Sequence, residues 1–375
     1  MRLLYQHVVQ SISKNDCQVI IDDLKSRVAT SFKIEGEDSK RDAVYRFLTT
    51  SRPVETWLQN VDDRIKIMSR KKVPFEFWMV TGGYGAGKSH IKEFLRRNEI
   101  EHLKFLEPDI SFMARSDERV ASISSIFSVI LLETKPFYNS LYDSIKEALP
   151  TPSNGEEVEE IKKAVRDYSI DDDFIDAFCT YANPNNSDRR DFRALEELII
   201  EKGEQLFLPL MKLFKDYLSI NAFCIFIDEF ESLQFLDSKR LDKFIQSIRP
   251  FYDTIASTIS NHDLPSFKTI VLCTYSYWND LTRDERSQAL ESRVREFEIP
   301  PLVEDEIKEL FEKIYMIYTK SDYQVPEIPL NINEIQPFLI NKAGIDAPLT
   351  PRFVISEILS IIEEPNDFLE RQSQL

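Results

Sequence analysis

The chain has 375 residues, of which 42% are hydrophobic and 30% are charged, a composition typical of a globular protein large enough for two or three domains. Its formal net charge of −17 argues against a surface coated in positive charge for nonspecific binding to nucleic acids. No run of about 18 apolar residues occurs, so we expect no membrane span, and the start of the chain lacks a signal-peptide pattern. The four cysteines and four histidines are scattered, which predicts buried thiols, no zinc site and a cytoplasmic location.

The first 74 residues are predicted to be mostly helical. Pro53 suits the first turn of a helix over 54–71, and Trp57 and Val61 belong to its apolar face. The basic run Arg70-Lys71-Lys72 follows. We interpret it as the cationic end of a helix, in preference to a nucleic-acid contact.

Four of the eight glycines lie in the segment 82–89, which reads Gly-Gly-Tyr-Gly-Ala-Gly-Lys-Ser. This matches G-x-x-x-x-G-K-[ST], a phosphate-binding loop in which curled backbone N–H groups point at phosphate oxygens. An apolar, strand-like segment (75–80) precedes it and a helix-like segment (90–97) follows, which is the expected context. We expect Lys88 to reach the β- and γ-phosphates of ATP and Ser89 to bind Mg²⁺. The predicted nucleotide-binding residues are Gly82, Gly83, Tyr84, Gly85, Ala86, Gly87, Lys88, Ser89 and His90.

The region from the loop helix to residue 220 is predicted to hold one strand and several helices. The segments 103–106 and 110–112 indicate a second strand, and two helices are expected within 121–149. Acidic helices between loop signals at 150–190 look like an insertion. A long helix over 191–218 is expected to be interrupted or kinked at Pro209.

A continuous apolar run over 222–227 is typical of a central parallel strand, and Asp228-Glu229 follows it directly. An aspartate at this position can hold Mg²⁺, and a glutamate beside it can activate the water that attacks the γ-phosphate. Alone, the pair could equally cap a strand and open an acidic loop. Together with the glycine-rich segment, it predicts a site for Mg-ATP and its hydrolysis.

A second apolar run, 269–274, ends in polar residues. Ser276 and Thr274, and further on Asn279, are candidates for orienting the attacking water. Helices are expected near 303–319, 332–342 and 351–363. Alternation of strands with helices predicts an α/β fold of the P-loop NTPase kind, with a parallel sheet flanked by helices. We expect a helical region over 1–74, an ATPase core over 75–302 with a helical insertion at about 120–220, and a helical lid over 303–375.

The order of glycine-rich loop, Ile-Asp-Glu strand and polar strand end resembles the AAA+ branch of P-loop ATPases. The chain is most similar to origin-recognition-like and BREX-system ATP-binding proteins. In that pattern a Ser-Arg is followed by an apolar segment ending in Pro-Pro, here Ser292-Arg293 and Pro300-Pro301, and then by a helical lid. The resemblance covers about 75–363. The longer 120–220 region and the N-terminal helices depart from it, and either could determine which partner is bound.

The resemblance also implies roles for three arginines. It implies that Arg293, or secondly Arg295, acts in trans on the γ-phosphate of a neighbouring subunit. The alternative is that both are surface arginines paired with nearby glutamates. Arg352, which follows Pro351 at the start of a lid helix, matches a lid arginine that contacts the same nucleotide.

Three functions could use these motifs. The first is an AAA+ type ATPase, in a homo-oligomer or multi-protein complex, that couples hydrolysis to a DNA-linked task such as phage defence, replication or transposition. DNA contact would be direct or through a partner. The second is a STAND-like nucleotide-gated switch or scaffold with slow turnover that recruits a protein. The third, a small-molecule kinase, is disfavoured by the Asp-Glu pair and by the three-helix lid.

Overall fold

The computed structural model describes residues 10, 12–26, 48–49, 51–96, 100–108, 110, 123, 125–149, 157–183, 192–258, 261, 263–283, 288–321, 323, 334–344, 347–365 and 368. The chain divides into two compact units that do not follow chain order. Unit 1 comprises Met1–Asp63, Thr81–Glu99 and Glu298–Leu375, and unit 2 comprises Arg64–Val80 and Ile100–Phe297. The three consecutive domains expected from the sequence remain a prediction.

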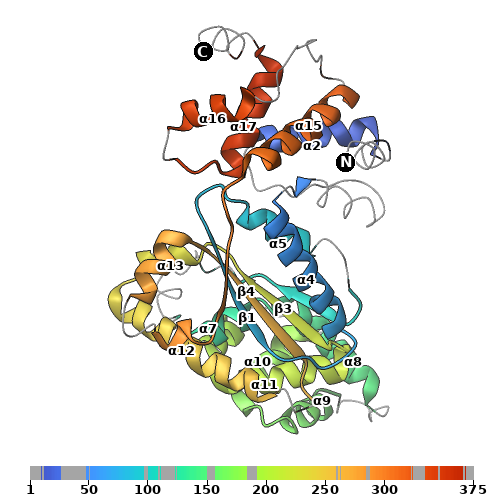
Figure 1. Ribbon diagram of the computed structural model, residues 1–375. Coiled ribbons are helices and arrows are strands. Elements are labelled where there is room, and N and C mark those ends of the chain that lie inside the picture. The colour runs from blue at the N-terminus through green and yellow to red at the C-terminus, as the bar shows by residue number, and fades with distance from the viewer. Residues whose placement is uncertain are drawn as a thin grey trace. The chain divides into compact units, whose positions relative to one another are not determined.

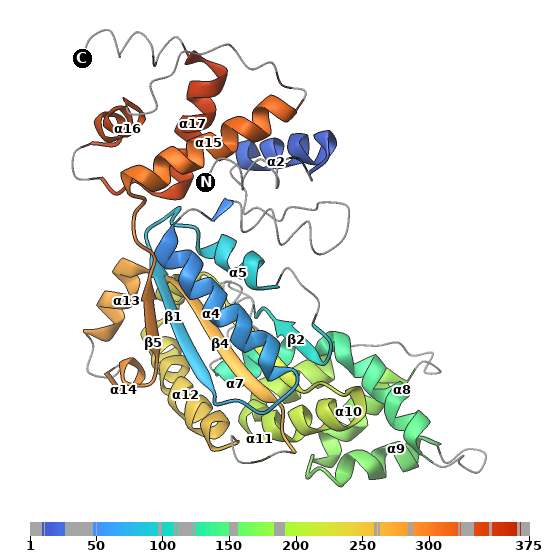
Figure 2. The same cartoon turned by 45° about the vertical axis from the view of Figure 1, so that its right-hand side comes forward.

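A five-stranded parallel sheet in the order β2-β3-β4-β1-β5 runs through unit 2 (Figures 1 and 2). Leu103 on β2 lies opposite Ala222 on β3, which lies opposite Ser266 on β4. Every residue of β3 is buried, as its apolar run predicted. The strands are β1 (Glu76–Gly82), β2 (Leu103–Leu106), β3 (Ala222–Ile227), β4 (Ser266–Thr274) and β5 (Arg295–Glu298). The predicted α/β fold with a parallel sheet flanked by helices is therefore confirmed.

Aromatic side chains join the sheet to a layer of helices in unit 2. Phe127 of α7 (Ile126–Leu132) packs edge-on against Phe207 of α11 (Arg193–Leu218) and Phe251 of α12 (Ser238–Ser257), with ring centroids 5.4 Å apart in both pairs. Phe207 also lies 5.8 Å from Phe267 of β4. Such tilted and edge-on pairs add to the stabilisation from burial alone.

The described helices of the segment predicted to be an insertion belong to unit 2 and pack through aromatic residues. Tyr138 lies 6.0 Å from the rings of both Phe178 and Phe214, which brings the insertion onto α11. One side of these helices therefore packs in the core, and their acidic residues lie on the opposite side, which faces solvent. The elements are η2 (Lys135–Phe137), α8 (Tyr138–Ala148), α9 (Glu157–Arg166) and α10 (Asp172–Ala182).

The prediction of a break at Pro209 was wrong about the place, because the backbone of α11 leaves helical geometry at Lys202. Pro209 lies inside the helix. The hydroxyl of Ser128 on α7 donates to the carbonyl of Ile200 at 3.2 Å, which inserts a side chain into the hydrogen-bond ladder of α11. A Cβ built on Gly203 would lie 2.5 Å from that hydroxyl. Close packing of α7 against α11 therefore accompanies the kink. Gly203 makes this close packing possible because it has no side chain.

Unit 1 combines the N-terminal helix with the C-terminal helices. Lys25 of α2 (Lys14–Ser26) pairs with Glu363 of α17 (Pro351–Glu363), and Tyr318 of α15 (Glu304–Lys320) donates to the same carboxylate at 2.8 Å. Helix α16 (Ile335–Ala343) contacts α15. The three lid helices lie close to their predicted ranges. Unit 1 also contains α5 (Lys88–Arg96) and the first part of α4 (Arg52–Met68), which starts beside Pro53 as predicted.

Short elements in unit 2 follow the carboxyl ends of the central strands. After β3 comes the 3-10 helix η3 (Phe230–Phe235), and after β4 comes α13 (Tyr275–Thr282), where the sequence analysis expected only a polar strand end. Helix α14 (Gln288–Glu291) precedes β5. Strand β5 was not predicted, because it reads Arg-Glu-Phe-Glu and is mostly exposed, as suits a charged edge strand.

Candidate functional site

The glycine-rich segment forms a tight loop between β1, which ends at Gly82, and α5, which begins at Lys88. Gly85 and Gly87 have φ angles of +78° and +97°, a left-handed region that side chains disfavour. A Cβ on Gly87 would meet nothing within 4 Å, so backbone conformation, and not crowding, is what requires glycine there. The hydrogen-bond ladder of α5 opens with the Ile91 N–H donating to Gly87. The N–H groups of Lys88 and Ser89 precede it, which is the arrangement that attracts anions to a helix N-terminus.

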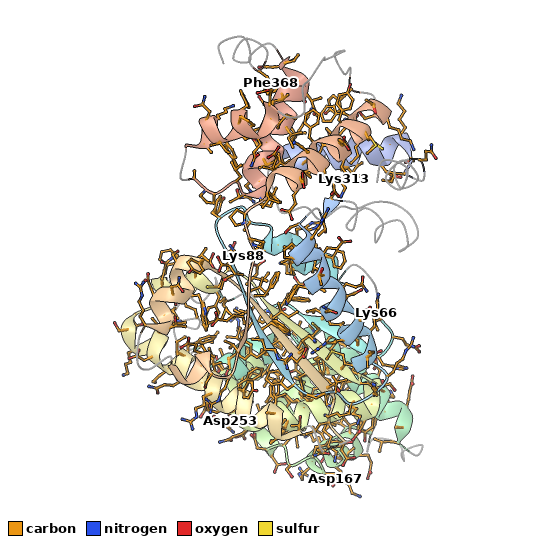
Figure 3. All side chains as sticks on the ribbon, in the orientation of Figure 1. Lys66, Lys88, Asp167, Asp253, Lys313 and Phe368 are labelled. Atoms are coloured by element: carbon orange, nitrogen blue, oxygen red, sulfur yellow. The ribbon has the colours of Figure 1, made fainter. Side chains whose placement is uncertain are left out.

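The ammonium group of Lys88 lies over the loop (Figure 3). Its Nζ donates to the carbonyls of Gly82 at 3.0 Å and Gly83 at 3.2 Å. A Cβ on Gly83 would meet nothing within 4 Å, so this side of the loop is open. A cation, a helix N-terminus and an open, curled backbone fit the phosphate groups of a nucleotide.

Arg352 at the start of α17 contacts the same loop within unit 1. Its backbone N–H donates to the carbonyl of Gly85 at 3.2 Å, and its guanidinium lies 4.8 Å from the ring centroid of Tyr84. Tyr84 is 81% exposed, and a Cβ on Gly85 would lie 2.8 Å from that of Arg352. The structure thus brings this predicted lid arginine to the predicted phosphate loop. Contact with a nucleotide remains a prediction.

His90 follows the loop, but its ring is engaged elsewhere in unit 1. Its Nε2 lies 3.0 Å from the hydroxyl of Thr49. Burial lowers the pKa of His90 to about 4, so the imidazole is neutral near pH 7. Any contribution of His90 to phosphate binding would therefore come from its place in the first turn of α5, and not from a positive charge.

Asp228 and Glu229 follow β3 in unit 2. The carboxylate of Asp228 accepts the backbone N–H of Glu229 at 2.9 Å. Glu229 is exposed and has φ 52° and ψ 41°, a left-handed conformation that costs a residue other than glycine about 1–3 kcal/mol. The next residue, Phe230, is fully buried and anchors the turn. Strain of this kind is concentrated at functional sites.

The polar residues after β4 lie near this turn, because β3 and β4 are neighbouring parallel strands. Thr274 ends β4 and precedes the first turn of α13, where Ser276 is exposed. The backbone N–H of Thr274 donates to Oε2 of Glu231 at 3.1 Å. Sequence reasoning noted Glu231 only as part of an acidic loop, and a contact between segments so far apart in the chain left no local signal.

The two arginines predicted to act in trans are paired with acidic residues of their own chain. Nε of Arg293 lies 3.3 Å from the carboxylate of Asp253 on α12. Nη1 of Arg295 lies 3.1 Å from Oε1 of Glu76, and its guanidinium lies 5.7 Å from the ring centroid of Trp78. The alternative interpretation expected both arginines to pair with nearby glutamates. Both are paired, but one partner is an aspartate and the other is a glutamate far away in the chain. Their action in trans remains a prediction.

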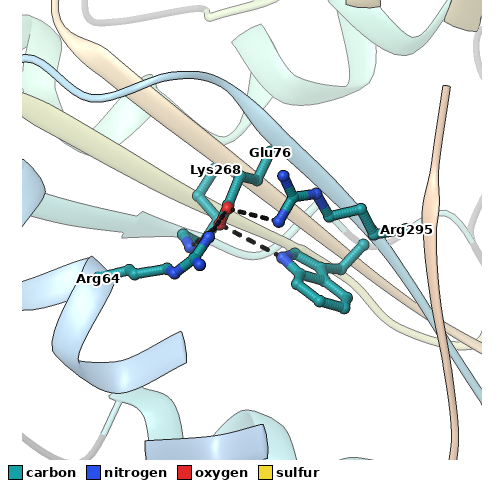
Figure 4. A network of polar contacts seen from close by, with 5 residues as sticks. Arg64, Glu76, Lys268 and Arg295 are labelled. Carbon is teal, nitrogen blue, oxygen red and sulfur yellow. Dashed lines mark hydrogen bonds and ion pairs between the residues drawn. The ribbon is translucent and has the colours of Figure 1, made fainter. Parts of the chain in front are cut away.

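Glu76, at the start of β1, is the centre of a network that the sequence did not reveal (Figure 4). Lys268 of β4, only 2% exposed, donates to its Oε2 at 2.5 Å. Arg64 of α4 and Arg295 both bond Oε1 from half-exposed positions. Burial pushes the pKa of Glu76 upward, but the hydrogen bond and charge of Lys268, the charge of Arg64 and the hydrogen bond from Trp78 together hold the pKa below its usual value. The resulting stabilisation is present above the pKa of the unfolded chain and is lost as pH falls through the folded value.

We expect Glu76→Ala to lower the free energy of unfolding by about 3–5 kcal/mol, because the ammonium of Lys268 would stay buried without its partner. Asp280→Ala, which breaks an exposed pair with Arg283 in the same unit, should cost about 1 kcal/mol or less. Urea denaturation measures both. Equal losses in the two variants would contradict the stabilising role of the buried pair.

No protein-family model matches the chain, and no curated protein matches its sequence with significance. None of the helices in the described ranges combines the length and apolar character needed to cross a membrane. Within those same ranges, no group of three or more His, Cys, Asp or Glu side chains could hold a metal ion. All four cysteines are buried and form no disulfide, as the sequence predicted. Any assignment of function therefore depends on the residues that follow β1, β3 and β4.

Proposed function

We propose that this protein is an ATPase that binds and hydrolyses Mg-ATP, of the AAA+ type that its motifs resemble. The observation that carries the proposal is the loop over 82–89. It combines two left-handed glycines, a lysine folded over the backbone and a helix N-terminus directly after a buried strand. Each of these features favours binding of a chain of phosphate groups.

The order of the strands supports a ligand site at the carboxyl ends of β1 and β4. In the order β2-β3-β4-β1-β5, the chain leaves β1 toward one edge of the sheet and leaves β4 toward the other. In open α/β sheets, ligands bind outside the carboxyl ends of strands at the point where the connections change direction. The glycine-rich loop follows β1 in the chain and Thr274 ends β4, the two strands at which the connections change direction.

Each site residue has a role that suits its chemistry. Lys88 would bind the β- and γ-phosphates, and Arg352 would add a second cation from the lid. Ser89 and Asp228 are the residues that would hold Mg²⁺, which neutralises charge on the phosphate oxygens when it is bound. Glu229 would accept a proton from the attacking water.

Two glutamates follow β3, and the structure favours Glu229 as the base. Glu231 is half-buried and its carboxylate is hydrogen-bonded to the backbone of Thr274. Glu229 is exposed and stands in a strained, left-handed turn. A general base must reach a water molecule, and an exposed carboxylate meets that requirement better than one held by a backbone N–H.

The resemblance places this activity in a DNA-linked complex, with the chain as an oligomer or as a subunit beside other proteins. One observation favours the second candidate, a slowly turning STAND-like switch. Both arginines proposed to act in trans are paired within their own chain, Arg293 with Asp253 and Arg295 with Glu76. A subunit whose arginines stay paired would gain little turnover from a neighbour.

ATP hydrolysis with and without double-stranded DNA, together with mass from light scattering, tests the proposal. DNA-stimulated turnover by an ATP-dependent oligomer is the expected result. Slow turnover by a monomer that DNA leaves unchanged would favour the switch. Absence of both nucleotide binding and turnover would contradict the proposed function.

A further inference from the structure

Glu231 links two segments that the proposed reaction would use. It lies two residues after Glu229, on η3, and its Oε2 accepts the N–H of Thr274 at 3.1 Å. Thr274 is the last residue of β4 and the residue before the first turn of α13. This hydrogen bond therefore ties the turn that carries Glu229 to the turn that carries Ser276.

We propose that Glu231 is a positioning residue for hydrolysis: it holds the polar end of β4 in register with the turn of Glu229. The inference rests on the proposed ATPase function. Within unit 2, it follows from the hydrogen bond and from the packing around it. A catalytic glutamate and a water-orienting residue on separate segments must keep their relative position, because a displacement of about 1 Å can reduce a rate by about 100-fold.

Packing beside the hydrogen bond restricts the same two segments. Phe230 is fully buried, and its ring meets that of Tyr277 on α13 edge-on, with centroids 6.3 Å apart. The hydroxyl of Tyr277 is buried and has no hydrogen-bond partner among the described residues, so this contact is made by the ring. Ring packing alone would let the two segments slide past each other. The hydrogen bond from the N–H of Thr274 to Glu231 is directional and fixes their relative position. Buried Phe230 lies between the two glutamates in the chain, of which Glu229 is exposed and Glu231 is hydrogen-bonded.

A purely structural role makes a different prediction. If Glu231 only satisfies a half-buried N–H, its loss should lower stability without a selective effect on the chemical step. If it positions the site, its loss should lower kcat while nucleotide affinity and the folded state are retained. Glutamine keeps a side-chain oxygen that can accept the same N–H. Glu231→Gln should therefore keep most of the wild-type rate.

The experiment measures kcat, the Kd for Mg-ATP and thermal stability in the full chain. Glu231→Ala should lower kcat by about 10- to 100-fold and change Kd by less than about 3-fold. Glu231→Gln should stay within about 3-fold of wild type in kcat. Gln234→Ala, an exposed change on the same 3-10 helix, is the matched control and should behave as wild type.

A second pair of variants removes the donor instead of the acceptor. Thr274 has φ −73°, which proline can adopt. Thr274→Ala removes the hydroxyl, and Thr274→Pro removes the hydroxyl and the N–H and adds the proline ring, so the change in their kcat ratio between the two Glu231 backgrounds reports the hydrogen bond. That ratio should be large with Glu231 present and close to one in the Glu231→Ala background.

The outcomes separate this proposal from the proposed function. A wild-type chain that neither binds nor hydrolyses ATP would overturn both. Hydrolysis by wild type that is unchanged in Glu231→Ala, or a loss that parallels reduced affinity and stability, would overturn the role of Glu231 alone. If Glu231→Ala fails to fold, failure of Glu231→Gln to keep the rate while it folds normally would overturn it as well.

Discussion

Glu229→Gln should leave ATP bound and slow its hydrolysis by about 100-fold or more. The amide keeps the size and polarity of the side chain but cannot take the proton of the attacking water. Glu229 follows a fully buried strand and stands in a strained turn, where its side chain is exposed to solvent. Phosphate release measures turnover, and an equilibrium titration with Mg-ATP measures affinity.

The matched control is Glu197→Gln, the same chemical change at an exposed position of α11 in the same unit. It should leave turnover and affinity unchanged. A Glu229→Gln variant that hydrolyses ATP at the wild-type rate would show that Glu229 is not the base.

Lys88→Ala should abolish nucleotide binding, with a loss in affinity of about 100-fold or more. The substitution removes the ammonium that lies over the loop and donates to Gly82 and Gly83. In the proposed complex the same ammonium binds the β- and γ-phosphates, so its loss removes charge-assisted hydrogen bonds to the most highly charged part of the ligand. Calorimetric titration of the purified protein with Mg-ATP is the measurement.

Lys92→Ala is the control, because it removes a half-buried lysine one turn further along α5 and keeps the loop intact. Its affinity for Mg-ATP should equal that of wild type. A thermal unfolding curve for each variant shows whether lost binding reflects lost structure. Intact affinity in a folded Lys88→Ala variant would remove the basis for the phosphate-loop assignment.

Most of the secondary structure could be predicted because its signals are local. The apolar run of β3 and the start of α4 beside Pro53 are each determined by a few neighbouring residues. The glycine-rich loop is local in the same way, since Gly85 and Gly87 are required by the backbone at those two positions. The parallel sheet followed from the alternation of strands and helices.

The features that the sequence did not reveal depend on partners far away in the chain. The kink at Lys202 lies beside a hydrogen bond from Ser128 to Ile200, and Glu231 is hydrogen-bonded to Thr274. The network around Glu76 joins β1 to β4 and β5, and a charged edge strand such as β5 has no apolar run to identify it. Pairing of this kind is decided by the fold, so residue types alone could not assign it.

Release of γ-phosphate from Mg-ATP by the purified wild-type chain, with protein in excess over nucleotide, tests the central claim most directly. The account predicts a bound nucleotide whose γ-phosphate is released at a measurable rate, and a rate at background in Glu229→Gln with the nucleotide still bound. A wild-type chain that fails to retain Mg-ATP and releases no phosphate would contradict it.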